Sequence, residues 1–112
     1  MANGNLFGVH GAALEVRAQR MNLLASNIAN ASTPNFKAKD IDFTQALASV
    51  ERQGGIDGAT LYRTPDSPSM DGNTVELSKE QTAFAENAVQ YQTTLSFLNG
   101  RINQLTRALK GE

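Results

Sequence analysis

The sequence predicts a mainly α-helical protein in which two long terminal helices pair as an antiparallel, coiled-coil-like hairpin. Three observations predict this fold. Apolar residues in the C-terminal third recur every three or four positions over about four heptads. The N-terminal third repeats that spacing more weakly, and the middle contains all three prolines and no sustained period. We therefore divide the chain into an N-terminal arm at 1–31, a turn-rich middle at 32–77 and a C-terminal arm at 78–112, with both arms forming one core domain.

The N-terminal arm is expected to form a helix that ends near Asn30 or Ala31. Pro34 fixes its own backbone and disfavours the helical conformation at Thr33, so the helix cannot continue through this point. Asn30 is expected to take the left-handed conformation that often ends a helix. The apolar seam alternates large with small residues, which would let a second helix approach closely: Phe7, Gly11, Leu14, Ala18, Met21, Ala25 and Ile28.

The middle is expected to contain turns and at most short strands. Alternating residues at 60–62 and 74–77 are typical of brief strands. Positions 64–73 are rich in proline, aspartate, serine, glycine and asparagine, which favour turns. Gly72 is expected to supply a positive φ there, and Asp71 or Asn73 to bond its own backbone.

The C-terminal arm is expected to form a helix from about Ser78 to Lys110. Ser78 and Gln81 have the spacing of a capping box at its start. Gly111 is expected to end it. The heptad positions form a continuous apolar seam: Phe84, Ala88, Tyr91, Leu95, Leu98, Ile102, Leu105 and Leu109.

These two arms can form only a thin core. Aromatic residues make up 6% of the 112-residue chain, tryptophan is absent, and small residues occupy much of the N-terminal seam. A two-helix hairpin of this composition buries too little apolar surface to be stable alone. The arms are therefore expected to complete their contacts on other subunits, and assembly is the first functional hypothesis.

The composition excludes several functional classes. Ten basic and eleven acidic residues leave a formal net charge of −1, which argues against binding to nucleic acid. The chain has no cysteine and a single histidine, His10, so thiolate zinc sites and multi-histidine sites are excluded. No run is apolar enough for a transmembrane helix, and the first residues lack the basic head of a cleaved signal peptide.

The remaining candidates for site chemistry are weak. Asp40 and Asp42 lack the third acid or the histidine that a metal-dependent nuclease would need. Positions 66–73 lack the alternating acids and the closing glutamate of a calcium loop. We therefore expect no catalytic residue, no cofactor, no metal and no small-molecule substrate.

The most specific string, LLASNIANASTPNFKAKDIDF, occupies residues 23–43. A helix ending in Asn-Ala-Asn, then a Thr-Pro turn, an aromatic and a basic residue, resembles the N-terminal signature of bacterial flagellar axial proteins of the rod and hook class. The continuation to residue 43 resembles the small B-type subunits of the proximal rod, and segments 71–76 and 85–92 agree. The residues that carry the resemblance are Asn27, Ala29, Asn30, Thr33, Pro34, Phe36, Lys37, Asp40, Asp42, Phe43, Asp71, Gly72 and Asn73.

The resemblance implies a non-enzymatic structural subunit of the flagellar basal-body rod. It implies export by the flagellar type III secretion system without a cleaved signal peptide, into a rod that spans the periplasm. The implied partners are other rod subunits, the rod-to-ring junction protein with the membrane ring, and the flagellar export apparatus, with no membrane insertion of its own. Two alternatives stay open: another small flagellar axial protein, and an unrelated coiled-coil adaptor.

The chain departs from this pattern at a few positions. The family more often has glycine where this chain has Asn35, and aspartate, tyrosine and arginine where it has Ser32, Phe36 and Lys39. The middle near Gly54 is also shorter than is common in the family. These departures keep the turn and its polarity.

Overall fold

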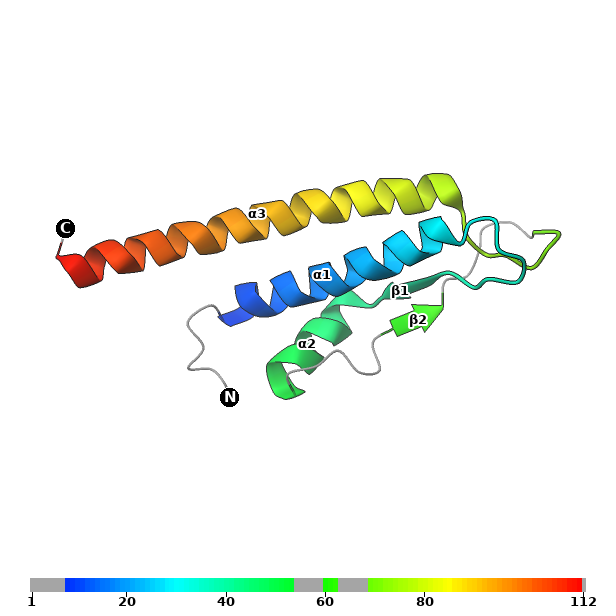
Figure 1. Ribbon diagram of the computed structural model, residues 1–112. Helices are drawn as coiled ribbons and strands as arrows, with labels where there is room; N and C mark the ends of the chain where they lie inside the picture. Colours follow the sequence, from blue (N-terminus) through cyan, green and yellow to red (C-terminus); the bar gives the residue numbers. More distant parts are fainter. Residues whose placement is uncertain (1–7, 54–59, 63–68, 112) are drawn as a thin grey trace.

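The two long helices of the protein lie side by side. The computed structural model describes residues 8–53, 60–62 and 69–111, and the molecule measures 64 × 26 × 18 Å (Figure 1). The terminal helices run antiparallel and pack against each other, so the predicted helical hairpin is confirmed. The elements in chain order are α1 (Gly8–Ala29), β1 (Lys39–Ile41), α2 (Phe43–Gln53), β2 (Thr60–Tyr62) and α3 (Leu77–Lys110).

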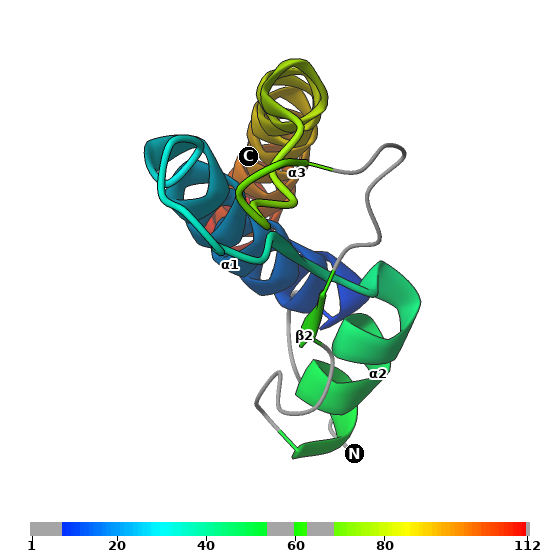
Figure 2. The ribbon, with the colours of Figure 1, turned by 90° about the vertical axis from the view of Figure 1, so that its right-hand side faces the viewer.

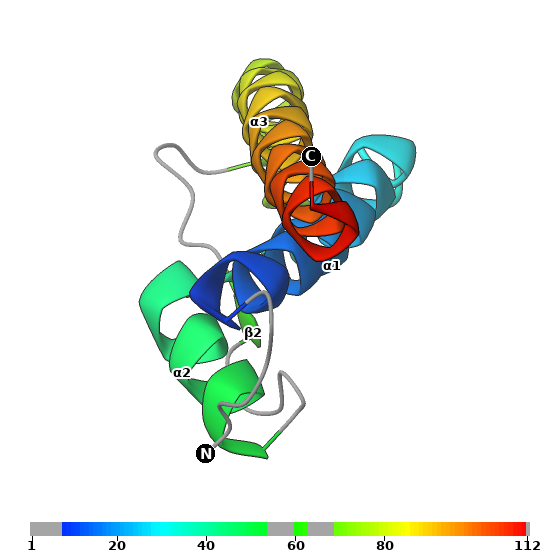
Figure 3. The ribbon, with the colours of Figure 1, turned by 90° about the vertical axis from the view of Figure 1, so that its left-hand side faces the viewer.

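Helix α1 lies in the centre of the fold. Helix α3 packs on one side of it, while α2 and β1 pack on another (Figures 2 and 3). The core between α1, β1 and α2 consists of the buried residues Val16, Ile41 and Ala46, with Leu23, Phe43 and Val50 packed around them. Because α1 is covered from two directions, its apolar residues cannot all pack against a single neighbouring helix.

The buried positions of α1 therefore differ from the predicted N-terminal seam. The buried residues are Ala12, Val16, Leu24 and Asn27. Of the seam residues, Phe7 lies outside the described residues, Ala25 is exposed, and Leu14, Met21 and Ile28 are half-buried. The half-buried seam residues retain accessible surface that a further helix could cover.

Helix α3 is longer than α1 and projects beyond its N-terminal end (Figure 1). Its 34 residues span about 50 Å at about 1.5 Å per residue, whereas α1 has 22 residues. The predicted bounds are confirmed to within one residue. Gly111 ends the helix in the left-handed conformation, with φ 77°, and its amide donates to the carbonyls of Arg107 and Ala108.

The predicted capping box at the start of α3 is wrong. The N-cap is Glu76 in an extended conformation, and its side chain makes no capping hydrogen bond. Ser78 lies inside the helix and is exposed. The first helical hydrogen bond runs from the Glu80 amide to the Glu76 carbonyl at 3.0 Å, so the N-cap is Glu76 and not Ser78.

One of the two predicted strands forms, at 60–62, and the other, at 74–77, does not. β1 and β2 pair antiparallel, with Lys39 opposite Tyr62 and Ile41 opposite Thr60, so the strand at 60–62 is confirmed. Residues 74–77 are not a strand, because α3 already begins at Leu77. β1 was not predicted, since two of its three residues are charged and only its pairing with β2 makes it a strand.

The middle also contains the 11-residue helix α2, so the expectation of at most short strands is wrong. Asp42 caps this helix: its Oδ1 accepts the Gln45 amide at 3.1 Å, and its carbonyl accepts the Ala46 amide at 2.9 Å. The sequence pattern that could have predicted α2 is an apolar face at positions 43, 46, 47 and 50. This face is too short to form a recognisable heptad repeat.

We expect Asp42→Ala to destabilise the protein by about 1 kcal/mol, because the substitution removes the acceptor that caps α2. Thermal unfolding followed by circular dichroism measures this change. Asp42→Asn is the matched control, since an asparagine oxygen accepts the same amide and should retain most of the stability. Equal losses from both variants would contradict the capping role.

Candidate functional site: the corner between the terminal helices

Two segments far apart in the sequence lie side by side at the end of the molecule where α1 ends and α3 begins (Figure 1). We call residues 30–38 and 71–75 the corner. The amide of Asn35 donates to the Asp71 carbonyl at 2.9 Å, and the amide of Thr74 donates to the Phe36 carbonyl at 2.9 Å. Thr74 Oγ1 accepts the Ala38 amide at 2.7 Å. Both segments of the family motif therefore belong to one structural unit.

The side chain of Asn73 binds the turn that follows α1. Its Nδ2 donates to the carbonyls of Asn30, Ala31 and Thr33 at 2.9, 3.2 and 2.7 Å. The carbonyls of Asn30 and Thr33 also accept the backbone amides of Thr33 and Phe36. Asn73 is 6% exposed, so this buried amide joins the turn after α1 to the segment just before α3.

Gly72 allows the two segments to approach closely. Its φ is +77°, and a Cβ at this position would lie 2.3 Å from Asn35 Oδ1. The carbonyl of Gly72 also accepts a hydrogen bond from Lys37 Nζ. Asp71 Oδ1 accepts the Asn73 amide at 3.1 Å, so the predicted positive φ and the predicted local turn bonds are confirmed.

The prediction of a left-handed Asn30 is wrong. Among the described non-glycine residues only Asn35 has a positive φ, at 65°. Asn30 instead continues the end of α1, where its amide and its Nδ2 both donate to the Ser26 carbonyl, at 3.0 and 2.9 Å. Thr33 Oγ1 donates to Asn30 Oδ1 at 3.1 Å. The chain therefore continues through Asn30 in a right-handed turn, and the left-handed residue is Asn35.

Asn27 links the corner to the body of the fold. It is 1% exposed, and its Nδ2 donates to the Lys39 carbonyl at 2.7 Å and to Glu80 Oε1 at 3.0 Å. Its Oδ1 accepts the Lys39 amide at 3.1 Å. One side chain thus joins α1, β1 and α3. Glu80 was missed as a site residue, although it falls one helical turn before Phe84 on the line of the C-terminal seam.

Asp40 pairs with an arginine on α1. Arg20 Nε and Nη2 donate to the two carboxylate oxygens of Asp40 at 2.8 and 3.1 Å. This hydrogen bond is the main cause that raises the pKa of Arg20, with smaller contributions from the Asp40, Glu80 and Glu86 charges and an opposing one from burial. Asp40 therefore holds β1 against α1. Arg20 was not predicted, because the pairing spans 20 residues of sequence.

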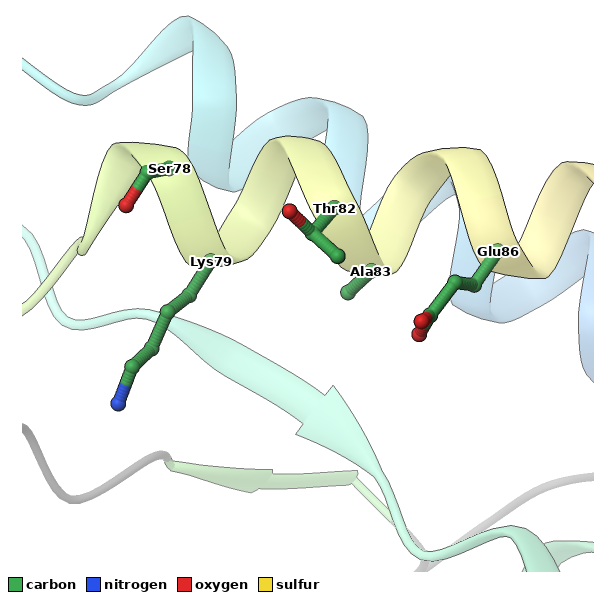
Figure 4. A pocket seen from close by; sticks show the side chains of 5 residues that line it. All are labelled: Ser78, Lys79, Thr82, Ala83 and Glu86. Atoms are coloured by element: carbon green, nitrogen blue, oxygen red, sulfur yellow. The ribbon is translucent and has the colours of Figure 1, made fainter.

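No arrangement for catalysis accompanies these contacts. Within residues 8–53, 60–62 and 69–111, no three His, Cys, Asp or Glu side chains gather as a metal site. An open hollow on α3 is lined by Ser78, Lys79, Thr82, Ala83 and Glu86 (Figure 4), a set without a nucleophile and base in contact. In the described part of the chain no helix is long and apolar enough to cross a membrane.

Comparison with known proteins identifies the family. A sequence model of the family described as "Flagella basal body rod protein" matches residues 7–37. The chain is 50% identical over 120 residues to a "Flagellar basal body rod protein FlgB" of Cereibacter sphaeroides, with 94% of each chain covered. It is 45% identical to the FlgB of Aeromonas hydrophila, over 95% of this chain and 93% of that one, and 40% identical to the FlgB of Escherichia coli strain K12, over 88% of both.

The chain belongs to the FlgB family of flagellar basal body rod proteins. The family is structural and not enzymatic, as the resemblance implied. The aligned length of 120 exceeds the 112 residues of this chain, so its relative has residues without a counterpart here. Asn35, where the resemblance leads us to expect glycine, has the left-handed φ that glycine adopts most easily and that asparagine also tolerates.

The residues that carry the resemblance lie in several parts of the fold. The corner holds Asn30, Thr33, Pro34, Phe36, Lys37, Asp71, Gly72 and Asn73. Asn27 and Asp40 fix α1 to β1, and Asp42 caps α2. Phe43 lies under the guanidinium of Arg17, at 4.5 Å from the ring centroid. Ala29 is the exposed last residue of α1.

The C-terminal seam is covered over only part of its length. Phe84, Ala88, Tyr91 and Leu95 are half-buried and Leu98 is buried. Beyond Leu98 every residue from Asn99 to Gly111 is exposed, including the seam residues Ile102 at 40%, Leu105 at 39% and Leu109 at 81%.

We expect Asn73→Ala to lower the free energy of unfolding by about 1–3 kcal/mol, because it removes the buried amide that donates to the turn after α1 and accepts the Val75 amide. Urea unfolding followed by circular dichroism measures the loss. Asn73→Asp keeps the oxygen that accepts the Val75 amide but removes the donor, so it should be at least as destabilising. A stable Asn73→Asp variant would show that the donor does not matter.

We expect Gly72→Ala to cost at least about 1–2 kcal/mol, because an alanine must adopt a left-handed backbone and its Cβ meets Asn35 Oδ1. Asn35→Gly removes the atom that the Cβ would meet. The double variant should therefore recover the part of the loss that is due to the contact, measured as a coupling in a double-mutant cycle. Purely additive losses would mean that Gly72 is needed for its backbone conformation alone.

Proposed function

We propose that this chain is a structural subunit of the proximal rod of the flagellar basal body, held in the rod by its terminal helices. Both arms, 1–31 and 78–112, form the axial core in this proposal, and the middle at 32–77 lies against it. Membership of the FlgB family supports the rod assignment. The rest of the proposal is supported by the distribution of covered and uncovered apolar surface.

The uncovered end of the C-terminal seam carries this proposal. Ile102, Leu105 and Leu109 continue the line of residues that is covered up to Leu98, and they keep its spacing of four and three residues. An apolar stripe at this spacing is typical of a helix that packs against another helix. Because the described part of α1 does not reach this stretch of α3, we expect a helix of another subunit to cover it.

The corner supports the same function in a different way. Its hydrogen bonds, together with those of Asn27, fix α1 and α3 relative to each other near the start of α3. A subunit with a fixed helix pair and a free apolar end adds to an assembly as a rigid unit. A drive shaft that transmits torque needs subunits of this kind.

The proposal extends to the partners. Other rod subunits would cover the seam with their own terminal helices. The rod-to-ring junction protein with the membrane ring and the flagellar export apparatus are the other partners that the resemblance implies, with export that leaves no cleaved signal peptide. These contacts would use faces of the subunit other than the α1–α3 interface.

We expect Ile102→Asp to abolish incorporation into the rod, and with it motility, because a carboxylate buried without a partner costs several kcal/mol. The substitution should leave the subunit fold intact, since Ile102 is outside the region of α3 that α1 covers. Arg101→Ala, one position away from the seam, is the matched control and should be tolerated. The measurement scores motility and rod assembly separately from secretion, and equal defects in both variants would contradict the seam.

A further inference from the structure

Two arginines on α1 lie one helical turn apart and have opposite surroundings. Arg20 pairs bidentately with Asp40, and the charges of Glu80 and Glu86 also stabilise it. Arg17 has no carboxylate partner in the described part of the chain. Its contacts are the neutral side chain of Gln90, with Nη1 donating to Oε1 at 2.8 Å, and the ring of Phe43.

The surroundings of Arg17 disfavour its charge. Burial and the neighbouring Arg20 charge lower the pKa of Arg17, in that order of importance. Its Nε is buried and makes no hydrogen bond to a described residue, and the same holds for Oδ1 of Asn87, whose Nδ2 donates to the Arg17 carbonyl at 2.8 Å. The contact of Arg17 with α3 therefore leaves hydrogen-bonding capacity unused in the isolated subunit.

Arg17 also occupies a position that an approaching molecule can reach. Its side chain is half-buried and bridges Gln90 on α3 to Phe43 at the start of α2, the two helices that flank α1 (Figure 2). Gln90 lines an open hollow on α3 with Ala85, Glu86 and Val89, and Val89 is 66% exposed. Glu86 lies one turn before Gln90. Its charge contributes to the raised pKa of Arg20 and not to the pKa of Arg17.

We propose that Arg17 is a docking residue that receives an aspartate or glutamate side chain from a neighbouring rod subunit. A guanidinium offers five N–H donors in a planar fork that matches a carboxylate, and among the described residues it donates only to the neutral side chain of Gln90. The ring of Phe43 holds the guanidinium plane in place and shields one side of it from water, which strengthens a charge pair formed there. This inference rests on the proposed function, because it needs the subunit to be packed in a rod.

The test compares three full-length variants for helix content, secretion and rod assembly. Arg17→Gln removes the charge and should fold and be secreted normally but incorporate into rods about tenfold less well or worse. Arg17→Lys keeps a charge without the fork and should be intermediate. Arg20→Gln breaks the internal pair with Asp40 and should instead lower the unfolding temperature of the subunit itself.

Motile revertants of Arg17→Glu identify the partner. The proposal expects substitutions that replace an acidic residue of a neighbouring subunit with lysine or arginine. Normal assembly of Arg17→Gln, or revertants confined to Gln90 and Phe43, would show that Arg17 serves only the fold of its own subunit. Ile102→Asp separates the two proposals: if it fails to assemble while Arg17→Gln succeeds, the docking role alone is wrong, whereas normal assembly of Ile102→Asp would overturn the seam.

Discussion

The amide group of Asn73 makes the contact on which the rest of the structure depends. The turn that follows α1 presents carbonyls that need donors, and a side chain more than 40 residues further along the chain, just before α3, supplies one. This contact holds the start of α3 beside the end of α1, and the two helices pack antiparallel from there. Gly72 and Asn35 make the approach possible through their left-handed backbones. Asn27 then fixes the pair one turn further in, through β1 and Glu80.

The parts of this fold that depend on local chemistry could be predicted from the sequence. The heptad spacing of α3, its glycine stop, the proline after α1 and the turn at Gly72 each involve residues close together in the chain. The parts that depend on distant partners could not. β1 is a strand only because β2 pairs with it, the turn after α1 is bound by Asn73 from a distant segment, and Arg20 and Glu80 become important only when α1, β1 and α3 meet. Helix α2 is intermediate between these cases. Its capping residue and its apolar face are visible in the sequence, but a helix of 11 residues is too short to show a sustained repeat.

The same arrangement explains why the subunit retains uncovered apolar surface. Helix α1 is covered by α3 on one side and by α2 and β1 on another, so its buried positions follow both neighbours and not a single heptad seam. Helix α3 has one neighbour and extends past it, which leaves the last third of its seam exposed. An isolated domain with such an exposed apolar stripe would tend to aggregate, whereas in the proposed function this stripe is the surface that a neighbouring rod subunit covers.

A density map of the assembled basal body at side-chain resolution tests this account most directly. The account predicts that the corner keeps its contacts between residues 30–38 and 71–75, and that apolar side chains of an adjacent subunit lie within about 4.5 Å of Ile102, Leu105 and Leu109. A rod in which these three side chains face solvent, or in which α1 and α3 separate at the corner to pair with other subunits, would contradict it.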